Sequence, residues 1–363
     1  MGSHDTKPFL RDFRISCKGP KQPKDSSAAR KQASPALVLP RAQANTTVAS
    51  DDPSNGTLSG MGHGMMRSSF LLQLERIMAV ICLSTLAQAG QTPALPPGEL
   101  VRVTVQNEVN ASIAPTSHHM FTSVKETARG SQTKLYCETK DAMAGMAVAY
   151  DGKPLTTQQR QAEEARLEEL MNNPAELARK RQREKEDTER VTKIVRAMPD
   201  AFLYEYAGTE PGRRGLGKEG DELIRLNFRP NPAYEPPSRV EQVLSGMKGV
   251  LLIDANRRRI ARIDGALFKE VSFGWGILGH LDKGGHFLVE QGDVGDGTWD
   301  MRRMGLAFTG RILLFKRLDI KSTETYSDFR AVPAGLTFAQ GVELLKRQEA
   351  TLAENRRGES DHK

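Results

Sequence analysis

The sequence has 363 residues, of which 38% are apolar and 27% are charged, and no uncharged apolar stretch reaches the ~18–20 residues of a membrane-spanning helix, which excludes a multi-span membrane protein. Lys and Arg outnumber Asp and Glu by 52 to 45, but residues 1–89 account for 11 of the basic and 6 of the acidic residues. Residues 90–363 therefore contain 41 basic and 39 acidic residues, which is nearly balanced. The charge of this part of the chain gives no support for nucleic-acid binding. Three cysteines exclude a disulfide-stapled scaffold and a four-cysteine zinc site.

An export signal is predicted within the N-terminal quarter of the chain. Residues 1–60 are rich in Ser, Pro, Ala, Lys and Gln without a sustained period, which predicts a disordered leader or a misassigned extension. In residues 61–89, Arg67 and Arg76 precede a ten-residue apolar run, and Ala87-Gln88-Ala89 has the small-x-small pattern of a cleavage site. We interpret 61–89 as a signal peptide; a buried core helix is the alternative.

Because this signal lies far from residue 1, the simplest hypothesis is that translation starts at Met65 or Met66. Cleavage after Ala89 would leave an exported chain, periplasmic or outer-membrane associated, with no transmembrane span. Cys137 is then the only cysteine, and it cannot form an internal disulfide. Its place in an apparent strand over 133–139 predicts a buried thiol without a catalytic role.

Residues 90–155 are predicted to form the N-terminal part of a β-sheet. Leu100–Val109 fits either a strand or a short helix. A hairpin follows, because two runs of β-forming residues flank the turn residues Arg129-Gly130. The predicted strands of this part are Met120–Thr127, Thr133–Thr139 and Met146–Tyr150.

The period of apolar residues changes from two to about 3.6 in residues 156–198, which predicts two helices in tandem. Asn173 caps the second helix, with Glu176 three residues after the cap. The middle of that helix, 180–190, is polar on all sides, and oppositely charged residues stand four apart. The pattern fits a solvated helix, and it also fits a charged docking arm for an envelope protein partner, spanning 174–198.

Residues 199–335 are predicted to form an antiparallel meander, because the gaps between strands are too short for the crossover helix that a parallel pair needs. The predicted strands are Ala201–Ala207, Glu222–Phe228, Gly249–Ile253, Arg258–Asp264, Leu267–Leu278, His286–Gln291, Thr298–Phe308 and Arg311–Thr325. A C-terminal helix is predicted in 336–354, where Thr337 and Gln340 form a capping box, and residues 355–363 are predicted to be a frayed tail.

Two glycine-rich motifs resemble phosphate-binding loops but lack the required context. Gly274–Gly279 matches GxGxxG, and Gly212–Lys218 matches GxxxxGK. Both kinds of binding loop need a helix N-terminus directly after the glycines, whereas a strand is predicted after each motif in this chain. We therefore predict a bent strand at the first motif, a hairpin loop at the second, and no cofactor.

The histidines offer one weak metal candidate. His280 and His286 flank the Gly284-Gly285 turn, with Asp282 and Glu290 nearby, and two imidazoles and a carboxylate would suffice for a weak site. A polar hairpin end explains the same residues, so we predict no metal. No nucleophile motif indicates a catalytic residue, and a hydrolase whose site is assembled from scattered residues is the remaining enzymatic hypothesis.

Aromatic residues on successive predicted strands give the strongest functional signal. Residues 312–315 are apolar on both strand faces, and a sheet that is apolar on both faces must be covered by helices or by a ligand. Either the helices fill the sheet completely, or they leave an apolar groove for an acyl chain or an apolar segment of a partner. The candidate ligand-binding residues are Phe273, Trp275, Phe287, Trp299, Phe308 and Phe315.

Two sets of residues carry a family resemblance. Gly249–Asp254 and Arg258–Asp264, followed by a long meander, resemble the periplasmic lipoprotein-sorting carriers of the Lol type over residues 200–330. Phe273–Gly276 and Tyr326–Arg330 resemble segments of an uncharacterised family of exported bacterial proteins. The carriers have an open, strongly curved antiparallel sheet closed by helices over an apolar cavity for lipoprotein acyl chains, so the resemblance implies the same arrangement for this chain.

We therefore predict an α+β fold, namely a strongly curved antiparallel sheet forming an open half-barrel, with covering helices and an inserted charged helical pair. The predicted function is that of an exported, non-enzymatic cell-envelope protein that binds an acyl chain or a lipoprotein-like apolar ligand in the concave face of the sheet. The alternative is a structural or interaction module of the envelope, with the charged helix as its docking arm.

Overall fold

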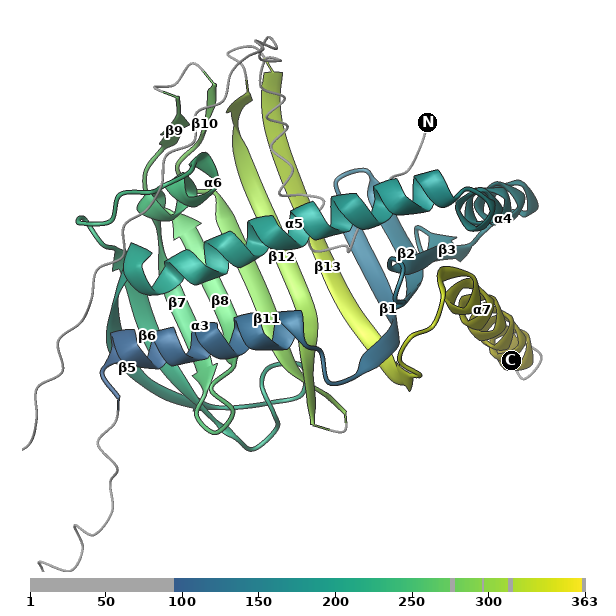
Figure 1. Ribbon diagram of the computed structural model, residues 1–363, viewed down its shortest axis with the longest axis horizontal. Coiled ribbons are helices and arrows are strands. Elements are labelled where there is room, and N and C mark those ends of the chain that lie inside the picture. The colour runs from purple at the N-terminus through teal and green to yellow at the C-terminus, as the bar shows by residue number, and fades with distance from the viewer. Residues whose placement is uncertain (1–94, 275–277, 296, 313–315, 361–363) are drawn as a thin grey trace, which may run out of the picture. The chain divides into compact units, whose positions relative to one another are not determined.

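The computed structural model describes residues 95–274, 278–295, 297–312 and 316–360. The predicted leader and signal peptide lie outside these residues. Within them, thirteen strands form one antiparallel sheet, which is curved and remains open, accompanied by five α-helices (Figure 1). The predicted α+β class, with an open and curved antiparallel sheet, is confirmed.

The elements follow one another along the chain in a simple order. The helices are α3 Pro97–Ile113, α4 Thr157–Asn172, α5 Pro174–Ala201, α6 Arg239–Gln242 and α7 Phe338–Ser360, with a 3₁₀ turn, η2, at Val243–Gly246. The strands are β1 His118–Thr127, β2 Gly130–Cys137, β3 Ala144–Tyr150, β4 Lys153–Pro154, β5 Phe202–Pro211, β6 Glu222–Pro230, β7 Met247–Asp254, β8 Ile260–Leu267, β9 Val271–Phe273, β10 Gly279–Leu281, β11 His286–Gly295, β12 Thr298–Ile312 and β13 Lys316–Val332.

The order of the strands in the sheet places β1, near the start of the described chain, beside β13, near its end. It runs β4-β3-β2-β1-β13-β12-β11-β8-β7-β6-β5, with β10 paired to β12 and β9 paired to β10. The hairpin of β1 and β2 is therefore inserted into the sheet beside the last strand, β13. All of these pairs are antiparallel, and for the meander of residues 199–335 this confirms the prediction made from the short gaps between strands.

Local capping signals fix the starts of the helices as predicted. The Asn173 side-chain oxygen accepts a hydrogen bond from the Glu176 backbone N–H at 3.2 Å. Thr337 and Gln340 cap α7 reciprocally, with distances of 2.8 and 3.2 Å. α7 continues to Ser360, beyond the predicted helix end and into the segment predicted to be a frayed tail. The ambiguous segment Leu100–Val109 is helical and lies within α3.

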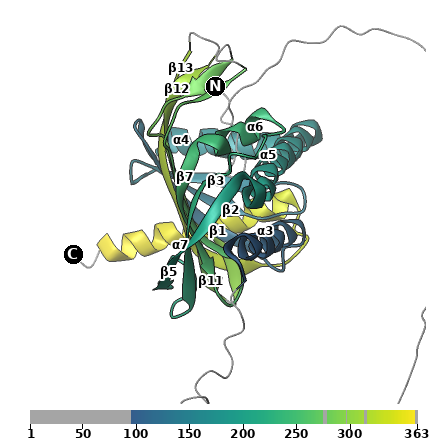
Figure 2. The same ribbon diagram turned by 90° about the vertical axis from the view of Figure 1, so that its left-hand side faces the viewer.

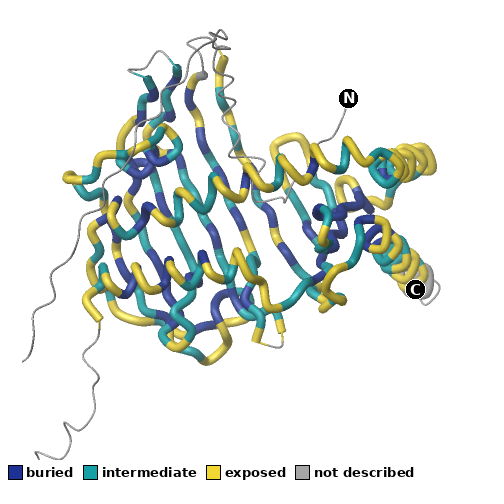
Figure 3. Tube along the Cα trace, viewed as in Figure 1, coloured by how far each residue is buried: buried dark blue, intermediate teal, exposed yellow. Residues whose placement is uncertain are grey.

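Helices α3 and α5 lie side by side across one face of the sheet, which we call the inner face (Figures 1 and 2). On α3, Leu100, Val101, Val105 and Val109 recur at helical spacing and are buried. The C-terminal half of α5 joins the same buried cluster through Ile194, Val195, Ala197, Met198 and Ala201. Burial of these stripes, together with inward side chains from strands along most of the sheet, forms the main core (Figure 3).

A second buried cluster lies on the opposite, outer face of the sheet at β2. Successive strand residues point to opposite faces, so Tyr136 belongs to the main core while Leu135 and Cys137 belong to the second cluster. Helices α4 and α7 cover this outer region, contributing Leu167 and Phe338 among others. A Cβ at Gly341 of α7 would lie 3.6 Å from the Cys137 sulfur, so α7 packs closely on β2.

The burial of Cys137 makes its thiol chemically inert. Burial, with a smaller effect of the adjacent Glu138 carboxylate, raises the pKa of Cys137 to about 11. At pH 8 only roughly one thiol in a thousand is then ionised, against about a quarter for an ordinary cysteine. In the full chain with Cys17→Ser and Cys82→Ser, we expect iodoacetamide to alkylate Cys137 about 100-fold more slowly than in concentrated guanidinium chloride. Equal rates in the two solvents would contradict this burial.

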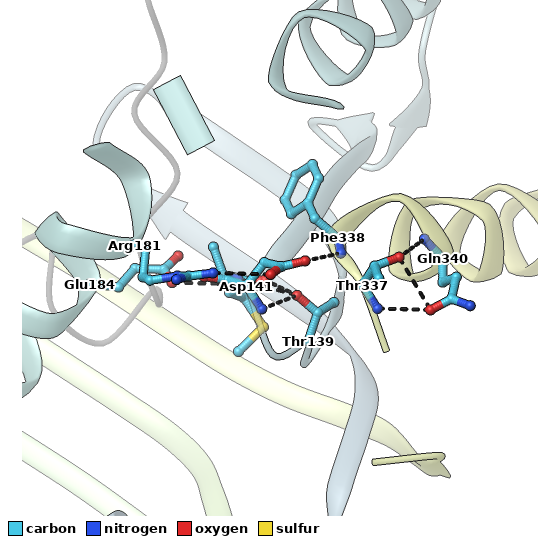
Figure 4. A network of polar contacts seen from close by, with 9 residues as sticks. Thr139, Asp141, Arg181, Glu184, Thr337, Phe338 and Gln340 are labelled. Atoms are coloured by element: carbon cyan, nitrogen blue, oxygen red, sulfur yellow. Dashed lines mark hydrogen bonds and ion pairs between the residues drawn. The ribbon is translucent and has the colours of Figure 1, made fainter. Parts of the chain in front are cut away.

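The turn between β2 and β3 ties helices α5 and α7 to the sheet (Figure 4). The Asp141 carboxylate accepts hydrogen bonds from Arg181 of α5 and from the Phe338 N–H at the start of α7, each at 3.0 Å. Met143 N–H donates to the Glu184 carboxylate at 3.1 Å. A carboxylate at a helix N-terminus satisfies an otherwise unpaired N–H and interacts favourably with the helix dipole.

The structure describes the second glycine-rich motif completely and the first only in part. Gly212–Lys218 lies in the loop between β5 and β6, where the buried Leu216 joins an outer-face cluster with Leu223 and Trp299. The predicted hairpin loop is confirmed there. In Gly274–Gly279, residues 275–277 lie outside the described residues, and Gly279 begins strand β10. The strand predicted over 267–278 is interrupted, because β8 ends at Leu267 and β9 covers only Val271–Phe273.

Candidate ligand cavity beneath helices α3 and α5

An apolar cavity of about 210 Å³ lies between the inner face of the sheet and the helices α3 and α5. Helical spacing places Val191, Ile194, Val195 and Met198 on one side of α5, and all four line the cavity. Alternation along β11 places Phe287, Val289 and Gln291 on one face of the strand, and all three line the cavity. The side chains that line the cavity from the neighbouring strands include Phe228, Ile260, Ile263, Met301 and Phe308.

A row of four paired residues crosses the sheet beside the cavity. Phe228, Gly249, Gly265 and Phe287 are directly paired across β6, β7, β8 and β11. A Cβ at Gly265 would lie 3.3 Å from the Phe228 ring and 2.9 Å from the Met247 methyl group. The Phe228 ring and the Met247 methyl group therefore fill the space beside Gly265, and both side chains line the cavity, as Phe287 does at the other end of the row.

The C-terminal end of α5 is held down by a buried tyrosine. The Tyr204 hydroxyl, from β5, donates a hydrogen bond to the Met198 carbonyl at 2.9 Å. Burial, with a contribution from the Asp200 carboxylate, raises the pKa of Tyr204 above its usual value. The hydroxyl therefore stays protonated, and it remains a donor to Met198 across the range of pH in which proteins are stable.

A larger and more polar space of about 740 Å³, which we call the vestibule, adjoins the apolar cavity. It lies among the C-terminal end of α3, the start of β1, the middle of α5 and the start of β12. The residues that line both spaces are Glu108, Ser112, Val191, Thr192, Gln291 and Met301. The combined site is therefore apolar at its inner end and polar where it widens.

The charged groups of the vestibule are bound to one another. Glu108 accepts two hydrogen bonds from the Arg259 guanidinium, at 2.9 and 3.0 Å, and one from the Ile260 N–H at 2.8 Å. This bidentate pair fixes the C-terminal part of α3 against β8. Arg257 donates to the Gly297 carbonyl at 2.8 Å and to Asp293 at 3.4 Å, and its guanidinium lies 5.9 Å from the centre of the Trp299 ring.

The structure brings only some of the predicted ligand-binding residues together. Phe287 and Phe308 line the cavity, and Phe273 belongs to the same buried cluster without lining it. Trp299 belongs to the outer-face cluster, and its indole N–H donates to the Ile260 carbonyl at 2.9 Å. Trp299 also lines the vestibule, as does Met301 two residues later on the same strand. Trp275 and Phe315 lie outside the described residues.

The residues of α3 and α5 that line the cavity were harder to predict from the sequence. The stripe on α5 indicated packing against an unspecified surface, and α3 was ambiguous between helix and strand. Glu108, Gln291 and Met301 carried no motif, because a single polar or flexible apolar residue at a cavity edge has no characteristic spacing. They meet at the cavity through tertiary contacts among α3, β11 and β12, which no local pattern encodes.

The two histidines considered as a weak metal candidate, for which we predicted no metal, are bound separately. His286 contacts Asp264 at 2.8 Å, and His280 contacts Asp282 at 3.3 Å. Glu290 instead receives hydrogen bonds from Arg262, the shorter at 2.6 Å. Glu270, His280 and Asp282 offer donor atoms within 4.8 Å of one another, and these are the described side chains whose geometry could hold a cation. Glu270 is exposed, and exposed acidic groups commonly gather without an ion.

Comparisons with known proteins give one similar solved structure. No protein family and no curated protein matches the sequence. Among solved structures, the chain is similar to a DUF1329 family protein from Desulfovibrio piger, with 13% identity and a TM-score of 0.24, over 66% of this chain and 96% of that one. Nothing in these comparisons links the chain to the Lol-type carriers. Within the described residues, no helix combines the length and apolar character needed to cross a membrane.

Proposed function

We propose that this protein is an exported, non-enzymatic binder of an apolar chain, such as an acyl chain, in the cavity beneath α3 and α5. The observation that carries the proposal is the cavity itself, whose walls are almost entirely Val, Ile, Met, Leu and Phe side chains. An apolar cavity of this kind stays dry and gains free energy when an apolar ligand fills it. No catalytic group is required for such binding.

The size of the cavity narrows the class of ligand. Its volume of about 210 Å³ compares with roughly 150 Å³ for an engineered protein cavity that takes benzene, so by proportion it holds roughly eight carbon atoms. A single chain of that length fits, whereas several acyl chains together do not. We therefore favour one acyl chain, or the end of one, over a complete lipoprotein anchor.

A series of 1-alkanols of increasing length tests this proposal. Each buried methylene contributes about 0.8 kcal/mol, so affinity should rise about fourfold per carbon. The rise should stop near roughly eight carbons, where the cavity is full. Isothermal titration calorimetry on the full chain measures the series. Native mass spectrometry of the purified protein should in addition reveal a bound single-chain lipid.

Two results would count against the proposal. If no alkanol binds, the cavity is not a ligand site. If affinity rises without limit as the chain lengthens, binding is non-specific partition onto an apolar surface. Thermal denaturation offers an independent check, because a ligand that binds only the folded state raises the melting temperature, by an amount that grows with the logarithm of ligand concentration above Kd.

Export to the periplasm or outer membrane is part of the same proposal and rests on residues 61–89. N-terminal sequencing of protein recovered from the cell envelope tests it, and the expected first residue is Gly90. The alternative role of α5 as a docking arm is less favoured, because Arg181 and Lys180 are already paired with Asp141 and Glu184 of the same chain. Residues of α5 also line the cavity. Deleting α5 to remove a partner-binding surface would therefore open the cavity as well.

A further inference from the structure

Gln291 stands where the apolar cavity meets the vestibule. It lies on β11, lines both spaces and is half-buried. Its backbone carbonyl accepts from the Gly217 N–H at 2.9 Å, which fixes the strand at that point. Its side-chain amide makes no hydrogen bond to any residue that the structure describes. The amide offers two donors and one acceptor at the boundary between the apolar and the polar part of the site.

The other polar groups at this boundary are already engaged. The Ser112 and Thr192 hydroxyls each donate to a carbonyl of their own helix at 2.8 Å, that of Val109 and that of Thr188. Glu108 is bound by Arg259 and by the Ile260 N–H. Among the described residues that line both spaces, the Gln291 amide is therefore the group best placed to bind a polar atom of a ligand.

The charges of the vestibule do not favour an anion. Its basic side chains within the described lining are His119, Arg257 and Arg259, and both guanidinium groups are bound to groups of the protein. Three carboxylates, those of Glu108, Glu138 and Asp300, line the same space. A ligand carboxylate or phosphate would have to give up its hydration there without a dedicated cation in return, which is unfavourable.

We propose that the ligand is a single-chain amphiphile with an uncharged, hydrogen-bonding head group, such as an acyl ester or amide. This inference rests on the proposed function, because it assigns the apolar chain to the cavity. The Gln291 amide binds the first polar group of the ligand, and the head group occupies the vestibule, whose 740 Å³ exceeds what a hydroxyl or carbonyl alone would need. Anionic amphiphiles with the same chain are discriminated against.

The test compares two ligands with the same chain, 1-monooctanoylglycerol and octanoate, by calorimetry at neutral pH with the full chain. The wild-type protein should bind the neutral ester at least about tenfold more tightly than the anion. Gln291→Leu should weaken binding of the ester by a factor of about 3 to 10, the contribution of one or two hydrogen bonds. Gln161→Leu, an exposed glutamine on α4, is the matched control and should change the binding of neither ligand.

The outcomes separate this inference from the proposed function. If neither ligand binds, the proposed function itself fails. If octanoate binds as tightly as the ester, or if Gln291→Leu binds the ester as the wild type does, the cavity is still a chain-binding site but the head-group inference is overturned. Gln291→Met, which is closer in shape, guards against a misfolded leucine variant and should give the same loss.

Discussion

Replacing Gly249 with alanine should destabilise the protein more than any other single methyl addition discussed here. A Cβ at this position would overlap the Asp264 carbonyl oxygen and lie 2.8 Å from the Gly265 Cα, both of them backbone atoms of β8. Backbone in a paired strand cannot move aside as a flexible side chain can. We expect a loss of about 3 kcal/mol, at the upper end of overpacking effects, and a fall in melting temperature of about 6–12 °C.

Gly305→Ala is the matched control for this change. Gly305 also lies in the sheet, on β12, but the nearest atom to its added Cβ would be the Leu288 Cβ at 3.5 Å, an ordinary contact. Alanine restricts the unfolded chain more than glycine does, so this variant should be neutral or slightly stabilised. Urea denaturation of both variants decides the matter, and similar midpoints would show that β7 and β8 are not packed as closely as described.

Filling the cavity should abolish ligand binding without unfolding the protein. Ile263 of β8 lines the cavity and is only half-buried, so Ile263→Trp places the larger ring in space that the ligand would occupy. Overpacking a filled core costs about 1–3 kcal/mol, and an existing cavity should reduce that cost. We expect affinity for 1-octanol to fall at least about tenfold, because much of the chain would lose its apolar contacts.

Ile263→Leu, which conserves volume, should bind 1-octanol as the wild type does. The melting temperature of the tryptophan variant should stay within a few degrees of the wild-type value. Retention of full affinity by a folded tryptophan variant would place the ligand elsewhere on the molecule. Loss of affinity in both variants would instead indicate that binding depends on the exact surface of Ile263.

Local signals in the sequence predicted where several helices begin. Where a predicted element differs from the structure, tertiary contacts explain the difference. The Asn173 cap and the Thr337–Gln340 capping box involve residues three apart, so their chemistry can be read directly. In contrast, Leu100–Val109 contains β-branched residues that suit a strand, yet it is helical because Leu100, Val105 and Val109 together bury one stripe against the sheet. Intrinsic propensity is weaker than such burial.

The apolar character of the candidate site could be predicted from the sequence, but only some of its residues could. The aromatic residues of β11 and β12 correctly indicated an apolar inner face, which Phe287 and Phe308 line. The sequence did not show which residues of the helices oppose them. The register of β11 against β12 shifts twice, after Glu290 and after Asp293, and such irregularities displace the side chains that follow. The position of Gln291 at the first of these shifts is therefore a tertiary feature.

The pairing of β1 with β13 has a consequence for how the chain reaches its folded state. β1 is among the first strands to be synthesised and β13 is the last, so one edge of the β1–β2 hairpin has no neighbour until residue 332 has been made. Contacts this distant in sequence slow the folding reaction, and an open strand edge invites pairing with other chains. We expect the rate-limiting step of refolding to be the docking of this hairpin, so that aggregation competes with folding mainly in chains that end before β13.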